Sequence, residues 1–158
     1  MTSKGYKTLQ AELHRLKTVE RRRVSNAIAV ARDHGDLSEN AEYDAAKHEQ
    51  GLIEAKIRDI ETKIATAQVV EISSLSGSKV IFGATVEICD MDSDEEKRIT
   101  IVGLDEANPT AGLISYQSPL ARALIGKNVD DVVRVKLPGG EKEYEIRSVA
   151  FLELDQVS

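Results

Sequence analysis

The sequence predicts an α+β protein, in which an N-terminal antiparallel α-helical coiled-coil hairpin precedes a small antiparallel-sheet domain with one short helix. Apolar residues recur with a helical period in the first half of the chain and alternate in the second half. All three prolines lie in the second half, and the stretch ISSLSGS separates the two patterns. We therefore place the hairpin at 1–74, a linker at 75–78 and the sheet domain at 79–158.

Two long helices are expected in the hairpin. Neither Gly nor Pro occurs between Tyr6 and Asp33, and Gly35 is suited to end this first helix. Its apolar residues recur mostly at steps of three or four; they are Leu9, Leu13, Leu16, Val19, Val24, Ala27, Ile28 and Ala31. The second helix has a heptad pattern, which indicates a coiled-coil seam of Ala46, Ile53, Ile57, Ile60, Ile64 and Ala67. Because the intervening turn is short, the helices should pack antiparallel.

The second half contains alternating segments typical of strands. They are KVIFGATVEI, KRITIVG, LISY, DVVRVKL and KEYEIRSVAFLEL. One short helix is expected between them, because Ser118 suits an N-cap, Pro119 the first helical position and Gly126 the residue after the helix.

Composition and charge limit the functional classes. The 158 residues include a single cysteine and three scattered histidines, so no zinc-ligand spacing is present. No apolar run is long enough to span a membrane, and we expect a reduced, cytoplasmic setting. Basic and acidic residues balance in 1–74, so the whole net charge of −6 lies in 75–158. A free-standing DNA-binding protein would show a basic surplus, which this chain lacks.

The turn of the hairpin is strongly acidic. Within RDHGDLSENAEYDAA there are five carboxylates, which are Asp33, Asp36, Glu39, Glu42 and Asp44. Asp36 and Glu39 have the spacing of a capping box for the second helix. Capping needs only two acids, however, and an anion such as Asp33 is disfavoured at a helix C-terminus. Carboxylates also suit Mg²⁺ or Mn²⁺, so the turn is alternatively part of a metal site completed by a partner.

The segment ARDHGDLSENAEYDAAKHEQG resembles the coiled-coil tip of bacterial transcript cleavage factors of the Gre family, nearer the GreA type. The similarity continues through KVIFGATVEI, DSDEEKRITIVGLDEA and ISYQSPLARALIGKNVDDVVRVKLPGGEKEYEI. It covers nearly the whole chain, in the same order and with the same domain sizes.

The resemblance implies an FKBP-like second domain that docks at the rim of the RNA polymerase secondary channel. The coiled coil would enter the channel, where Asp36 and Glu39 help to hold a Mg²⁺ ion shared with the polymerase. The isolated protein would bind no stable cofactor and would not be an enzyme, because the polymerase itself cleaves its backtracked RNA. Arg32 and Lys47 occupy the positions of a basic patch that contacts this RNA near its 3′ end. A monomer without membrane contact is expected.

The remaining assignments leave alternatives open. Our candidate polymerase-docking segment is Ser118, Pro119, Leu120 and Arg122, although Leu120 is equally suited to cover the sheet. A solvated face is the simpler interpretation of Arg21-Arg22-Arg23, and packing is favoured over base stacking for Tyr43. Instead of a cleavage factor, the protein could be a secondary-channel inhibitor or a non-catalytic coiled-coil adaptor. A self-sufficient nuclease is disfavoured, because no further carboxylate or histidine cluster completes a site.

Overall fold

The computed structural model describes residues 1–33 and 40–153. Its contacts form two compact units, Tyr6–Ala67 and a unit that joins Met1–Gly5 to the chain from Gln68 onward. This grouping differs from the expected 1–74 and 79–158, because the first residues pair with the segment after the hairpin. The Val70 amide donates to the carbonyl of Met1 over 2.9 Å, and the Ser3 amide donates to the carbonyl of Val70 over 3.0 Å.

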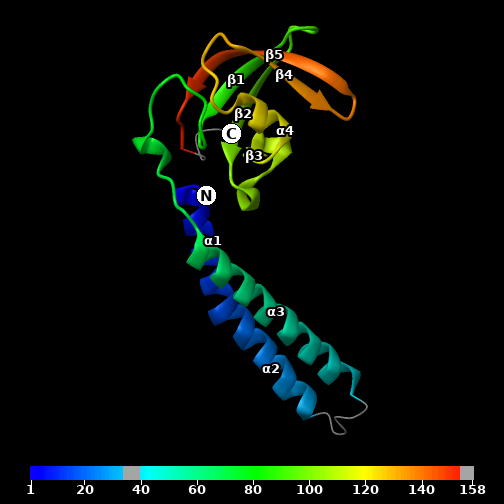
Figure 1. The fold of residues 1–158 in the computed structure, drawn as a ribbon. Helices are drawn as coiled ribbons and strands as arrows, with labels where there is room; N and C mark the ends of the chain where they lie inside the picture. Colours follow the sequence, from blue (N-terminus) through cyan, green and yellow to red (C-terminus); the bar gives the residue numbers. More distant parts are fainter. Residues whose placement is uncertain (34–39, 154–158) are drawn as a thin grey trace. The chain divides into compact units, whose positions relative to one another are not determined.

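The helical unit has two arms that lie side by side (Figure 1). The first arm runs through α1 (Ser3–Arg15), the π-helical turn η1 (Leu16–Glu20) and α2 (Arg21–Arg32). The second arm is α3 (Ala41–Thr66), whose 26 residues span about 39 Å. Residue numbers fall along α3 as they rise along the first arm, which confirms the antiparallel hairpin; the pairs are Lys17–Glu61, Arg21–Glu54 and Arg23–Glu49.

A single apolar seam holds the arms together. The first arm buries Leu16, Val24 and Ile28, and α3 buries Ala46, Ile53, Ile57 and Ile60. Leu9, Leu13 and Ile64 pack against this seam while remaining partly exposed. The heptad positions from Ala46 to Ile64 therefore face the first arm as the spacing predicts.

The first arm departs from a regular α-helix at η1. Leu16 and Val24 are eight residues apart, about 2.2 turns of α-helix, which would offset them by about 80° around the helix axis. The i→i+5 bonding of a π turn takes in an extra residue and brings both side chains onto the seam. The same shift leaves Val19, which the sequence pattern assigned to the apolar stripe, 57% exposed. Ala27 is also exposed.

The other unit is built on one five-stranded sheet (Figure 1). Its strands are β1 (Thr85–Asp90), β2 (Glu96–Val102), β3 (Leu113–Ser115), β4 (Val132–Leu137) and β5 (Gly140–Ala150), in the order β3-β2-β1-β5-β4. The short helix α4 (Pro119–Leu124) buries Ala121 and Leu124 against a core that includes Val86, Ile101 and Tyr144. Each strand overlaps one of the segments that the sequence indicates, and the helix begins at Pro119 as predicted.

The sheet is mixed, which corrects the expectation of an antiparallel sheet, because β3 pairs with β2 in parallel. Two 3₁₀ turns, η3 (Leu104–Glu106) and η4 (Pro109–Ala111), return the chain to Thr100 in the second half of β2, where β3 begins. Gly112 makes this return possible, since its φ is +78° and a Cβ there would lie 2.8 Å from the carbonyl oxygen of Arg98. Period-two alternation marks strands but does not reveal their direction.

The first residues of the chain are anchored by a side chain from η3. Thr2 is buried, and its amide donates to Glu106 Oε1 over 2.8 Å. The Thr2 hydroxyl donates to Glu106 Oε2 and accepts from the Gly5 amide at 3.1 Å, as an N-cap of α1 does. After the hairpin the chain forms a further 3₁₀ turn, η2 (Ile72–Ser74), which buries Ile72. In the part of the chain that the structure describes, no helix is long and apolar enough to cross a membrane.

Candidate functional site at the closed end of the hairpin

The closed end of the hairpin lies between the last turn of α2 and the first turn of α3. Asp33 ends α2, and its amide still bonds to the carbonyls of Ala29 and Val30 at 3.3 and 3.2 Å. On the other side, Asn40 has an extended backbone and α3 begins at Ala41. The segment 34–39 joins these ends and lies outside the described residues, and with it the candidate acids Asp36 and Glu39.

Asn40 connects both arms through its side-chain amide. Its Oδ1 accepts from the Tyr43 amide at 3.1 Å and so caps α3. Its Nδ2 donates to the carbonyl of Ala31 at 2.6 Å and satisfies a carbonyl in the last turn of α2. One side chain thus fixes where the first arm ends and where the second begins.

The predicted capping box is therefore wrong, because Asn40 and not Asp36 is the N-cap of α3. Sequence reasoning missed Asn40, although Asn is as good an N-cap as Asp and stands directly before the helical run AEYDAAK. The D-x-x-E spacing of Asp36 and Glu39 pointed to an earlier start. As a consequence, the N-cap position of α3 belongs to Asn40.

The three other carboxylates of the turn are described and exposed. Glu42 and Asp44 lie in the first turn of α3, where the helix dipole favours anions. Asp33 lies at the end of α2, where it does not. Residues 1–33 and 40–153 contain no group of three or more acidic, His or Cys side chains placed to hold a metal ion.

The two predicted RNA-contacting bases are exposed near the same end. Arg32 is the last residue of α2 and Lys47 lies in the second turn of α3. Each follows a buried alanine, Ala31 or Ala46. The Lys47 ammonium donates to Gln50 Oε1 at 3.2 Å, and within the described residues Arg32 forms no ion pair. Tyr43 packs partly buried against the hairpin core, which confirms the packing role.

The candidate docking segment divides into structural and exposed residues. Ser118 Oγ accepts from the Ala121 amide at 3.3 Å, and Pro119 occupies the first turn of α4, as predicted. Leu120 packs against the sheet core, so its side chain is already engaged. Pro119 and Arg122 remain exposed. The helix ends before Gly126, which has a φ of +90°.

Comparison with known proteins covers both units. Residues 1–69 match the family described as transcription elongation factor, N-terminal, and residues 75–151 match the family described as transcription elongation factor, GreA/GreB, C-term. The chain belongs to the GreA/GreB family of transcription elongation factors. Together the two matches include both arms of the hairpin and all five strands.

Individual GreA proteins are similar over nearly their full length. Transcription elongation factor GreA of Phenylobacterium zucineum is 59% identical over 152 residues, which is 96% of this chain and 97% of the relative. That of Xanthomonas axonopodis pv. citri is 53% identical over 154 residues, with 97% and 98% covered. Among solved structures, GreA factor homolog 1 of Thermus thermophilus is 29% identical with a TM-score of 0.42, covering 94% of this chain and 96% of its own.

Proposed function

We propose that this GreA/GreB protein stimulates bacterial RNA polymerase to cleave backtracked RNA and so returns arrested complexes to elongation. The sheet unit docks at the rim of the secondary channel, with Pro119 and Arg122 of α4 as exposed contacts. The hairpin enters the channel and presents Asp36 and Glu39. The polymerase performs the hydrolysis, and the protein alone is not a nuclease.

The observation that carries this proposal is the N-cap of α3. If the acidic turn served only to start the second helix, its acids would form the cap, as the adaptor interpretation requires. Asn40 forms that cap instead and also closes the turn through the carbonyl of Ala31. Because Asn40 takes the capping role, the acids of the turn are better explained by another role, and binding to a partner is the one we propose.

The donor set suits a magnesium ion. Carboxylate oxygens are the ligands that Mg²⁺ prefers, and two of them alone leave most of its shell to water or to a partner. Asp36 and Glu39 would therefore hold the ion jointly with the polymerase. When bound there, Mg²⁺ would supply a Lewis acid for phosphodiester hydrolysis. Arg32 and Lys47 would bind phosphates of the RNA with salt-sensitive contacts.

Isosteric neutral substitutions test the proposal. Asp36→Asn with Glu39→Gln removes two negative charges while leaving Asn40 to cap α3. We expect unchanged helicity and polymerase binding but cleavage slowed at least roughly tenfold, since the lost groups contact the ion directly. Asp92→Asn with Glu95→Gln is the matched control, because it removes two exposed carboxylates with the same spacing between β1 and β2, outside the hairpin. Cleavage at the native rate in the Asp36→Asn, Glu39→Gln variant would contradict the proposal.

The same assay separates the remaining alternatives. A channel inhibitor would bind the polymerase and slow both elongation and cleavage. An adaptor would bind without changing either rate. Cleavage by the purified protein in the absence of polymerase would show that it is itself a nuclease.

A further inference from the structure

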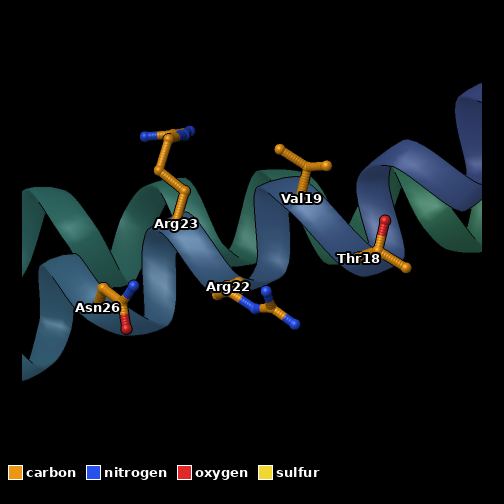
Figure 2. A pocket seen from close by; sticks show the side chains of 5 residues that line it. All are labelled: Thr18, Val19, Arg22, Arg23 and Asn26. Atoms are coloured by element: carbon orange, nitrogen blue, oxygen red, sulfur yellow. The ribbon is translucent and has the colours of Figure 1, made fainter.

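A hollow of about 560 Å³ lies on the outer surface of the first arm at the π turn. Its five lining side chains all come from η1 and the start of α2, and Figure 2 shows them projecting from this one helix; they are Thr18, Val19, Arg22, Arg23 and Asn26. No side chain of α3 lines it. The hollow is thus a feature of the exposed face and not of the seam.

The apolar part of the hollow results from the π turn. Because η1 takes in an extra residue, Val19 leaves the seam and is 57% exposed. The Thr18 hydroxyl donates back to the carbonyl of His14 at 2.7 Å, which commits its proton to the helix. Val19 and the Thr18 methyl group therefore offer an apolar surface beside Arg22 and Arg23.

The three consecutive arginines differ in their partners. Arg21 forms two hydrogen bonds with Glu54, at 2.7 and 2.9 Å, and Arg23 binds both Glu20 and Glu49. These glutamates hold the pKa of each guanidinium above its usual range by hydrogen bonding to the charged form. The Arg22 side chain forms no hydrogen bond or ion pair with any residue that the structure describes.

The charge around the hollow suits one carboxylate. Arg23 is neutralised by two glutamates, so Arg22 is the one cation of the lining without a described partner. A nucleic acid backbone presents repeated phosphates and is bound by several Lys or Arg side chains. A single free guanidinium beside an exposed valine instead fits a protein surface that presents a carboxylate next to an apolar side chain, since Arg is enriched in such contacts.

We propose that this hollow is a second protein-contact site, at which Arg22 binds a carboxylate and Val19 is covered by an apolar side chain of the same partner. The inference rests on the proposed function, which makes RNA polymerase the partner and a wall of its channel the surface concerned. The Asn26 side chain adds a polar group beside Arg22. The contact would hold the side of the hairpin against the channel wall and would take no part in the hydrolysis.

The test measures polymerase affinity and the dependence of cleavage on factor concentration. Arg22→Ala should weaken binding roughly tenfold. Arg22→Glu should weaken it more, because the new glutamate would repel the carboxylate of the partner. Arg58→Glu makes the same charge change at an exposed position of α3, outside the hollow. We expect this control to bind like the native chain. Melting curves of the Arg22 variants should match that of the native chain, since the Arg22 side chain forms no hydrogen bond or ion pair with a described residue.

The outcomes separate the site from the function. Higher factor concentration should restore cleavage to Arg22→Glu but not to the Asp36→Asn, Glu39→Gln variant. Native affinity in Arg22→Glu, with cleavage still lost in the tip variant, would overturn the site and leave the function intact. Failure of the native protein to bind polymerase would overturn both. If the Arg22 substitutions change only self-association or only RNA binding, the polymerase-contact site would also be overturned, in favour of a dimer contact or an RNA contact.

Discussion

The two units of the molecule are stabilised in different ways, and the difference shows where surface substitutions should act. In the sheet unit Val86, Ile101 and Ile146 are completely buried between the sheet and its covering segments. In the hairpin the buried residues form a single seam, and Ile28 and Ile60 are still 8% exposed. Most hairpin residues thus face outward, where they determine partner contacts more than stability.

The largest expected effect on the free energy of unfolding comes from creating a cavity in the core of each unit. Ile146→Ala should cost about 4–5 kcal/mol, because its enclosed site cannot collapse, whereas Ile57→Ala should cost about 2–3 kcal/mol, because two helices can approach each other. Hydrogen exchange monitored separately for β5 and α3 would measure both, since the units need not unfold together. An equal or larger cost for Ile57→Ala would remove this distinction.

A smaller effect is expected at the closed end of the hairpin. Asn40→Ala should destabilise the helical unit by about 1 kcal/mol, because it removes the cap of α3 and the donor to Ala31 together. Asn40→Asp is the matched control, since it keeps the cap but loses the donor. Circular dichroism melting should rank the native chain above Asn40→Asp and Asn40→Ala lowest. If both variants melt like the native protein, Asn40 does not fix the two arms.

The smallest effect concerns the exposed ion pairs. Hydrogen bonds from Arg21 to Glu54 and from Arg23 to Glu49 lower the pKa of each carboxyl below its usual range. Their contribution is fully present above the unfolded pKa of about 4.3 and is lost as pH falls through the folded value. The helical unit should therefore lose stability below about pH 4. Melting curves followed by circular dichroism at several pH values would measure this loss. Arg21→Ala should flatten this pH dependence, and an unchanged profile would show that its ion pair contributes nothing.

Local signals accounted for most of the fold. Ser118, Pro119 and Gly126 bracket α4 because a cap, a fixed φ and a positive φ are properties of single residues. The features that were not predicted depend on residues far away in the sequence, or on how side-chain positions rotate around a long helix. The parallel β2–β3 pair depends on how the chain returns through Gly112, and the π turn on matching Leu16 and Val24 to the same seam.

The candidate site divides in the same way. Arg32 and Lys47 were expected near the hairpin end and lie there, because helical spacing places them. The cap was assigned to Asp36 because Asp and Asn have equal N-cap propensity, whereas in the structure Asn40 accepts from the Tyr43 amide and donates to Ala31. The roles of Asp36 and Glu39 remain predictions that the cleavage assay addresses.

The anchoring of Thr2 by Glu106 has a consequence for biosynthesis. The ribosome makes the chain from the N-terminus, and the seam partners in Tyr6–Ala67 all emerge before the sheet begins. Thr2 must wait for Glu106, and the central strand β1 must wait for β5, which ends at Ala150. The hairpin is therefore expected to form during translation, whereas the unit containing the first five residues closes only when synthesis is nearly complete.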